Sequence, residues 1–221
     1  MGGRPDCPWG LGRPTRPGGG GGMMGQGRLE EDVTDEEVVA QVLAGRTGRF
    51  ALLVRRHQAA LFRQALAMGL DRDTAEDMVQ DSLVRAFQGL EGCREKGRFR
   101  VWVARILRNR CLDHLKSAPV QRNDPLVPDL LYRGGGPEEG REETALRALL
   151  AEALNRLPED QREAFLLRHV DGFSYREMSE IADASESALK MRVHRAREAL
   201  RVHLGGAAAG QDVTMSGGSS S

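Results

Sequence analysis

Basic and hydrogen-bonding side chains gather on one face of a predicted helix over residues 186–204, where they could contact DNA. Apolar residues recur along it at helical spacing and form one stripe: Leu189, Val193, Ala196 and Leu200. The front, away from that stripe, carries Lys190, Met191, His194, Arg195 and Arg201. A shorter predicted helix, 174–181, precedes it after a tight turn. A helix anchored by its back with a basic front fits the major groove, so the pattern predicts a helix-turn-helix that binds DNA. An ordinary helical hairpin with a charged outer face is the alternative.

A second basic helix is predicted over residues 99–116. Residues 98–116 carry six bases against one acid, Asp113. Its apolar stripe consists of Phe99, Trp102, Val103, Ile106 and Leu107, which favours core packing for Trp102 over stacking on bases. Arg105, Arg108, Asn109 and Lys116 share another face. Arginine and lysine suit phosphates and asparagine can read base edges, so this face is a second candidate for nucleic acid. A merely solvated face is the alternative.

An acidic helix is predicted over residues 73–87. Residues 71–81 carry five acids against Arg72. Opposite the apolar stripe of this helix lies a polar face with a valine in its middle: Asp77, Gln80, Asp81, Val84 and Gln88. A solvated face would explain most of this pattern. Together with the two basic helices, it instead suggests a surface for another protein.

Composition excludes several classes of protein. The 221 residues hold 32 basic and 32 acidic side chains. No run of 18 apolar residues occurs, and the N-terminus lacks the apolar region of a secretory signal, so we expect neither membrane insertion nor export. Three cysteines without pairable or metal-ligand spacing suit a reducing cytoplasm. The five histidines show no ligand-like pairing, and no phosphate-binding loop follows a strand. We therefore expect no enzyme, no cofactor and no metal.

The chain divides into five segments. Residues 1–31 are rich in glycine and proline and are predicted to be disordered. A first helical domain spans 32–117 and begins with the capping-box pattern "TDEE". Residues 118–141 form a flexible linker with four prolines between Ser117 and Gly140. A second domain spans 142–204, and 205–221 is a disordered tail. No segment alternates with period two, so the predicted fold is all-α, with two small domains.

Two blocks of the sequence resemble a known family. "DTAEDMVQDSLVRAF" and "FRVWVARILRNRCLDHLKS" are similar to the second conserved region of extracytoplasmic-function (ECF) sigma factors, which belong to the sigma-70 superfamily. "LPEDQREAFLLRHVDGFSYREMSEIADASESALKMRVHRAREAL" is similar to the fourth. The resemblance implies a cytoplasmic, non-enzymatic factor that binds core RNA polymerase and directs it to promoters. It also implies three partners: the beta-prime coiled coil and beta flap of the polymerase, promoter DNA, and an anti-sigma factor.

The resemblance also assigns roles to individual residues. The polymerase-binding residues would be Asp77, Gln80, Asp81 and Val84. The minus-ten element would be bound by Arg100, Arg105, Arg108, Asn109 and Lys116, with an extruded base received by the loop at 89–98. The minus-thirty-five element would be bound by Ser187, Lys190, Met191, Arg192, His194, Arg195 and Arg197, among which Arg192 and Arg197 lie nearer the phosphates.

Two positions depart from the family pattern. Asp183 stands in the helix-turn-helix where a glycine is usual, and aspartate tolerates the left-handed conformation at modest cost. Ala188 replaces a usual threonine, so Ser185 or Ser187 is expected to cap the recognition helix. Two rival functions remain. One is a helix-turn-helix regulator that acts without polymerase, with the first domain for oligomerisation or sensing. The other is an enzyme, for which the histidines offer no ligand-like pairing.

Overall fold

The computed structural model describes residues 33–117 and 141–212, and within those ranges every regular element is helical. The first domain contains α2 (Asp35–Leu43), α3 (Phe50–Ala67), α4 (Arg72–Gln88) and α5 (Phe99–Ser117). The second contains α6 (Arg141–Asn155), α7 (Glu159–Phe165), α8 (Tyr175–Ala182) and α9 (Glu186–Asp212). The predicted disordered N-terminus and nearly all of the predicted linker lie outside the described residues.

Capping side chains set where two helices of the first domain, α2 and α4, begin. Thr34 and Glu37 form the predicted capping box at α2: Thr34 Oγ1 accepts from the Glu37 amide, and Glu37 Oε2 accepts from the Thr34 amide at 2.8 Å. Asp71 caps α4 by accepting from the Thr74 amide at 2.9 Å. Gly69 has a φ of +89° between α3 and α4, a conformation that favours glycine. These local signals account for the starts of α2 and α4, and the helix predicted over 73–87 agrees with α4 to within one residue at each end.

Aromatic side chains join the helices of the first domain. The fully buried ring of Phe50 meets Phe87 of α4 edge-on at 5.1 Å between centroids, and Phe99 of α5 at 6.0 Å. Trp102 is half-buried and packs against this core, as expected. Cys111 is fully buried, and burial raises the pKa of its thiol to about 12.

The second domain differs from the prediction at two places. Residues Leu166–Val170 form a π-helical turn directly after α7, which no pattern in the sequence indicates. The helix predicted to end near Leu204 continues to Asp212, so the prediction of a disordered tail from residue 205 is wrong for residues 205–212. The alanines at 207–209 offset the helix-breaking tendency of Gly205 and Gly206. Residues 213–221 lie outside the described part.

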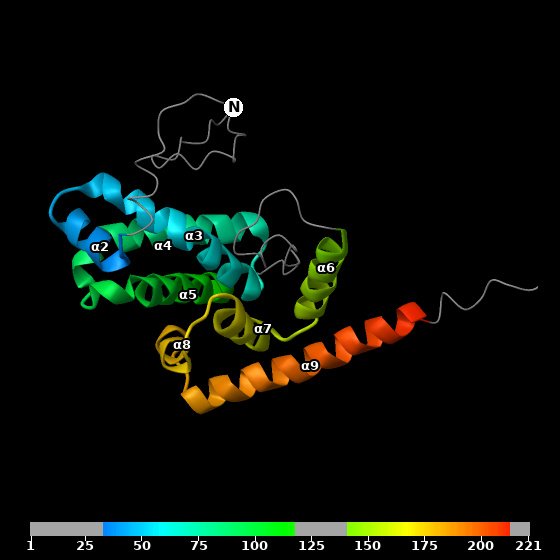
Figure 1. The fold of residues 1–221 in the computed structure, drawn as a ribbon. Coiled ribbons are helices and arrows are strands. Elements are labelled where there is room, and N and C mark those ends of the chain that lie inside the picture. The colour runs from blue at the N-terminus through cyan, green and yellow to red at the C-terminus, as the bar shows by residue number, and fades with distance from the viewer. Residues whose placement is uncertain (1–32, 118–140, 213–221) are drawn as a thin grey trace, which may run out of the picture.

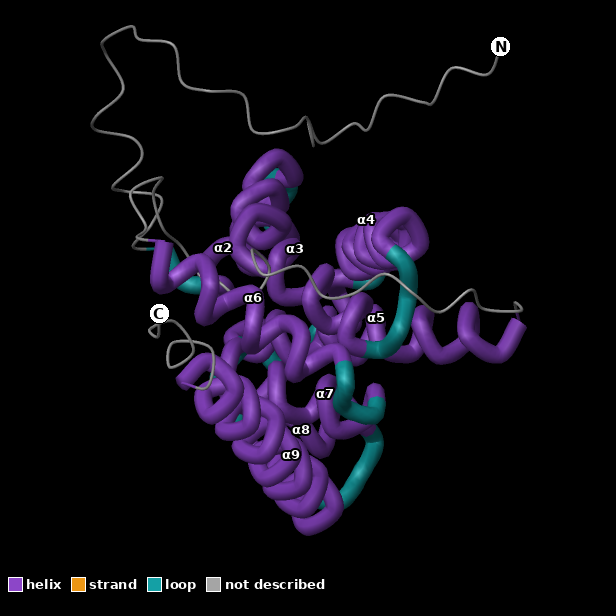
Figure 2. The backbone as a smooth tube through the Cα atoms, turned by 90° about the vertical axis from the view of Figure 1, so that its right-hand side faces the viewer, coloured by secondary structure: helices purple, strands orange, loops and turns teal. Residues whose placement is uncertain are grey.

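The two domains pack directly on each other. In Figure 1, α7 and α8 lie between α5 of the first domain and the long α9, and Figure 2 shows the same order after a quarter turn. One cluster of buried apolar side chains runs through both domains, from Leu53 and Leu107 to Leu167 and Met178. In the part of the chain that the structure describes, no helix is long and apolar enough to cross a membrane.

Candidate functional site

The turn between α8 and α9 completes the predicted helix-turn-helix. Asp183 ends α8 with φ 49° and ψ 49°, the left-handed conformation expected where glycine is usual. Ser179 Oγ donates to the Ala184 carbonyl at 2.6 Å and holds the turn closed. Of the two serines considered as caps for α9, Ser185 is in place, because its Oγ accepts from the Ala188 amide at 3.2 Å.

The outer face of α9 presents most of the residues predicted to read the minus-thirty-five element. The apolar stripe at the back of α9 is only 0–4% exposed, and its burial fixes which face of the helix points outward. The stripe consists of Leu189, Val193, Ala196 and Leu200. The exposed predicted residues are Ser187, Lys190, Met191, His194, Arg195 and Arg197. Arg192 is only partly exposed, and its Nε lies 3.2 Å from Asp160 of α7. The front is thus basic with one apolar side chain, Met191, half exposed.

The predicted polymerase-binding face of α4 is exposed at its rim and half-buried at its centre. Asp77 and Val84 are exposed, whereas Gln80 and Asp81 are partly buried. Asp81 Oδ2 accepts from Arg85 at 2.9 Å and from Arg110 of α5 at 2.7 Å. Burial alone would raise the pKa of Asp81, but hydrogen bonds and charges from Arg85 and Arg110 outweigh it and lower that pKa. Asp81 therefore links α4 to α5 as well as facing outward.

The predicted minus-ten residues of α5 fall into two groups. Arg105, Asn109 and Lys116 are exposed. Arg100 and Arg108 point instead at the second domain, where their partners are Glu177 at 3.3 Å and Glu163 at 3.1 Å. The structure thus separates Arg108 from Arg105, Asn109 and Lys116, with which the helical pattern had grouped it.

Ion pairs between the domains are the polar feature that the sequence did not reveal. Arg63 of α3 and Asp171, just after the π-helical turn, lie 2.5 Å apart with side chains only 4% and 3% exposed. Arg63 stands beside Gln64 in the otherwise apolar run "ALFRQALA", and this was the available signal for it. Its partner lies 108 residues away, so no local pattern could identify the pair.

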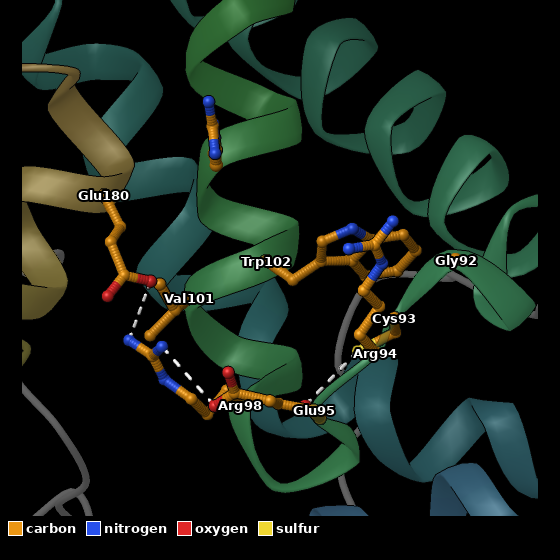
Figure 3. A pocket seen from close by; sticks show the side chains of 9 residues that line it. Gly92, Cys93, Arg94, Glu95, Arg98, Val101, Trp102 and Glu180 are labelled. Atoms are coloured by element: carbon orange, nitrogen blue, oxygen red, sulfur yellow. Dashed lines mark hydrogen bonds and ion pairs between the residues drawn. The ribbon is translucent and has the colours of Figure 1, made fainter.

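A cavity of about 200 Å³ lies beside the N-terminal half of α5 (Figure 3). The loop at 89–98 and α5 form most of its wall through Gly92, Cys93, Arg94, Glu95, Arg98, Val101, Trp102 and Arg105. Glu180 of α8 completes the lining from the second domain. The cavity combines an indole ring with three guanidinium groups and the carboxylates of Glu95 and Glu180. Such a lining suits a planar, hydrogen-bonding group attached to a phosphate backbone.

Sequence models of two domain families match the chain in the order of the two domains. Residues 53–119 match sigma-70 region 2 and residues 147–200 match sigma-70 region 4. The ECF RNA polymerase sigma-E factor of Salmonella typhimurium is 31% identical over 185 residues, covering 78% of this chain and 95% of that protein.

Two solved structures resemble the model. The structure of CnrH in complex with the cytosolic domain of CnrY aligns with a TM-score of 0.55 and 28% identity, over 78% of this chain and 97% of that one. The sigma factor RpoE from Bartonella quintana, in complex with the anti-sigma factor NepR, aligns with a TM-score of 0.52 and 27% identity, over 66% and 89%.

Proposed function

The chain belongs to the ECF sigma factors of the sigma-70 family, which are non-enzymatic initiation factors of RNA polymerase, and we propose that its two domains divide promoter recognition between them. The observation that carries this division is the presence of two separate basic helix faces, on α5 and α9, in two domains. As an RNA polymerase sigma factor, the chain serves promoter-specific initiation of transcription. The assignment of each face to a promoter element is the proposal.

In this proposal α9 reads the minus-thirty-five element. Its buried stripe leaves the basic front free to enter the major groove, with Lys190, His194 and Arg195 toward base edges. Met191 offers apolar contact, suited to a thymine methyl group. Arg192, Arg197 and Ser187 lie toward the phosphates. The pairing of Arg192 with Asp160 supports a positional role for that arginine, because α7 fixes its side chain.

The first domain then captures the opened minus-ten region. Arg105, Asn109 and Lys116 are exposed for the DNA strand, and the cavity beside them has room and chemistry for one extruded base. Trp102 lies at the wall of this cavity while its other contacts are with the core. Arg100 and Arg108 join this surface once they leave the second domain.

Two surfaces are proposed to hold the polymerase. Asp77, Gln80, Asp81 and Val84 of α4 would dock on the beta-prime coiled coil, since they combine charged and hydrogen-bonding groups with one exposed apolar side chain, Val84. Leu146 of α6 and Val202 of α9 are 61% and 67% exposed. These apolar side chains support a second contact, with the beta flap.

An anti-sigma factor is the remaining proposed partner. CnrH is bound to the cytosolic domain of CnrY and RpoE to the anti-sigma factor NepR, and the chain aligns with most of both sigma factors. We place the protein in the cytoplasm, where polymerase and promoter are found.

Run-off transcription tests the proposal most directly. Purified chain is added to core polymerase on fragments of genomic DNA, with core polymerase alone as the control. Transcripts that start downstream of common minus-thirty-five and minus-ten sequences are expected only when the chain and core polymerase are both present. Sequence-specific DNA binding by the chain alone, with no effect on polymerase, would instead establish the stand-alone regulator.

A further inference from the structure

Two cationic side chains lie over the ring of Tyr175, the first residue of α8. The guanidinium carbon of Arg168 lies 4.9 Å from the centroid of that ring, and the ammonium nitrogen of Lys190 lies 5.6 Å from it. Arg168 belongs to the π-helical turn and Lys190 to α9, so one ring joins three segments of the second domain. Separations below about 6 Å allow a cation–π contact, in which the ring quadrupole attracts the positive charge.

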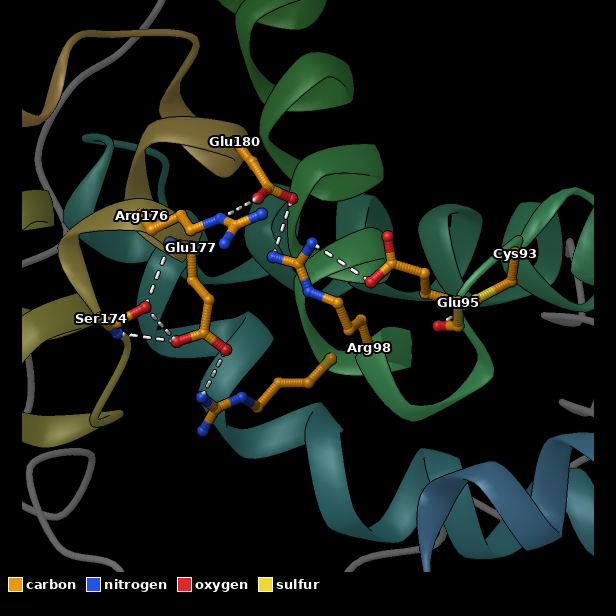
Figure 4. Close-up of polar contacts among 8 residues, drawn as sticks. Cys93, Glu95, Arg98, Ser174, Arg176, Glu177 and Glu180 are labelled. Carbon is orange, nitrogen blue, oxygen red and sulfur yellow. Dashed lines mark hydrogen bonds and ion pairs between the residues drawn. The ribbon is translucent and has the colours of Figure 1, made fainter.

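The residues around Tyr175 hold its ring in place. Ser174 caps α8 directly before it, because Ser174 Oγ accepts from the Glu177 amide at 3.2 Å (Figure 4). Arg168 Nη1 donates to the Phe173 carbonyl at 3.0 Å, which fixes the guanidinium beside the start of α8. Tyr175 itself is half-buried and packs against the apolar core. Its ring therefore offers Lys190 a surface of fixed position.

Lys190 is held only weakly apart from this ring. Its side chain is 58% exposed and lies 3.8 Å from Glu186 Oε2, one turn earlier on α9. An exposed ion pair of this kind restrains two long side chains very little. Lysine carries its charge at the end of a flexible four-carbon stem, unlike the planar fork of arginine. The ring of Tyr175 is thus the contact that limits where the ammonium group can go.

The contact places the ammonium group at one edge of the outer face of α9. Lys190 and Arg195 are five positions apart, so they lie about 140° apart around the helix axis. Tyr175 holds the Lys190 ammonium on the side of α8, the helix that crosses the DNA backbone in a helix-turn-helix. Lys190 and Arg195 can therefore address different base pairs in the major groove.

We propose that Tyr175 is a positioning residue for promoter recognition: its ring restricts the ammonium group of Lys190 and so makes Lys190 selective for the base at one position of the minus-thirty-five element. The face of the ring provides the contact, and the hydroxyl group is not needed for it. Exclusion of water at the DNA surface strengthens the contact, because cation–π attraction is larger between desolvated groups. This inference rests on the proposed role of α9.

The charge distribution of the ring can be changed at nearly constant shape. Tyr175→Phe removes the hydroxyl and keeps the ring face. Replacing Tyr175 by a trifluorinated phenylalanine keeps the shape of that variant but withdraws electron density from the ring face, which carries the negative part of the quadrupole. Tyr175→Leu removes the ring altogether. Each change is made in the full chain, and circular dichroism melts show whether the fold is retained.

Base preference is measured with holoenzyme assembled from core polymerase and each variant. Promoters mapped by run-off transcription, with each of the four bases at each minus-thirty-five position, compete for the holoenzyme. Lys190→Gln identifies the position that Lys190 reads, because base preference is lost there. At that position Tyr175→Leu and the fluorinated ring should lower the preference about two- to fivefold, whereas Tyr175→Phe should keep it. Preference at the other positions should not change, although a general loosening of the domain would change it.

A double variant tests whether the ring acts through Lys190. Tyr175→Leu combined with Lys190→Gln should match Lys190→Gln alone, since no ammonium group is left to position. If the leucine variant does not fold, the fluorinated ring takes its place in both comparisons. Equal preference in the Tyr175→Phe and fluorinated variants, or an even loss at all positions, would overturn the inference and leave the proposed function standing. Unchanged preference in Lys190→Gln would instead refute the proposed contact of Lys190 with base edges, and the inference with it.

Discussion

Replacing Gln80 and Asp81 separately should distinguish a polymerase contact from a structural one. Asp81 accepts from Arg110 at 2.7 Å and from Arg85 at 2.9 Å, with side chains of Asp81 and Arg110 about one-third exposed. Ion pairs of this exposure contribute about 0.2–1 kcal/mol each, so Asp81→Ala should lower the free energy of unfolding by about 1 kcal/mol. Gln80→Ala should change it by no more than about 0.5 kcal/mol. The two variants should therefore differ in their free energy of unfolding, with the larger loss for Asp81→Ala.

Affinity for core polymerase should behave differently. A central interface residue can contribute about 2 kcal/mol to the binding free energy. For Gln80→Ala this loss corresponds to a dissociation constant about 30-fold larger than that of the wild type. The assay is a titration of labelled chain with core polymerase, alongside urea unfolding of each variant. Glu91→Gln removes an exposed acid of the same domain outside α4 and serves as the control.

A double-mutant cycle with Arg110→Ala isolates the link between α4 and α5. The coupling between Asp81 and Arg110 in unfolding should be about 0.2–1 kcal/mol. Arg110→Ala should weaken polymerase binding less than Asp81→Ala, because Asp81 is expected to touch the polymerase itself. Wild-type affinity in both Gln80→Ala and Asp81→Ala would refute the assignment of this face. Equal losses for Asp81→Ala and Arg110→Ala would mean that Asp81 only positions α5.

Four further substitutions have predicted effects. Arg195→Ala should remove about 1–3 kcal/mol of discrimination between bases at one position of the minus-thirty-five element. Arg197→Ala should instead weaken DNA binding by the same factor for every promoter sequence, and competition between promoter variants measures both effects. Asp183→Gly should stabilise the fold by about 0.5–1 kcal/mol in thermal unfolding, because glycine adopts the left-handed conformation without steric cost. Burial alone would raise the pKa of Asp35, but His57 and Arg56 outweigh it and lower that pKa below 3.8. The stabilisation from ionised Asp35 is therefore present above about pH 4 and is lost as the pH falls further. Asp35→Asn should lower the free energy of unfolding by about 1.5–3 kcal/mol at neutral pH. The difference from the wild type should shrink when unfolding is measured in acid.

Local patterns predicted the helices well because the signals that start and stop them are themselves local. The capping box at Thr34 and the apolar stripe of α9 lie within a few turns of the residues they order. The left-handed Asp183 was expected for another reason, because the family pattern usually has a glycine at that position. The continuation of α9 past Leu204 was missed because Gly205 and Gly206 mimic a stop signal.

The sequence predicted which side chains of the candidate site lie on the surface of each helix, but not which of them a second domain covers. Rotation about a helix axis follows from its own stripe, so the exposed front of α9 was found correctly. What covers a front depends on residues far along the chain, and Arg100 and Arg108 meet acids 77 and 55 residues away. A helical wheel distinguishes the buried positions of a helix from those on the surface of its own domain. It does not show whether solvent or a second domain covers that surface.

The two oxygens of Glu177 serve different contacts, and this has a kinetic consequence. Oε2 accepts from the amide and hydroxyl of Ser174 at 2.7 and 2.8 Å and caps α8, while Oε1 faces Arg100 at 3.3 Å (Figure 4). Departure of Arg100 therefore leaves the start of the helix-turn-helix intact. Separation of the domains would be a rigid-body motion of preformed parts, for which microseconds to milliseconds are typical. The delay before such a chain engages polymerase would then depend on the rate of encounter and not on any step of refolding.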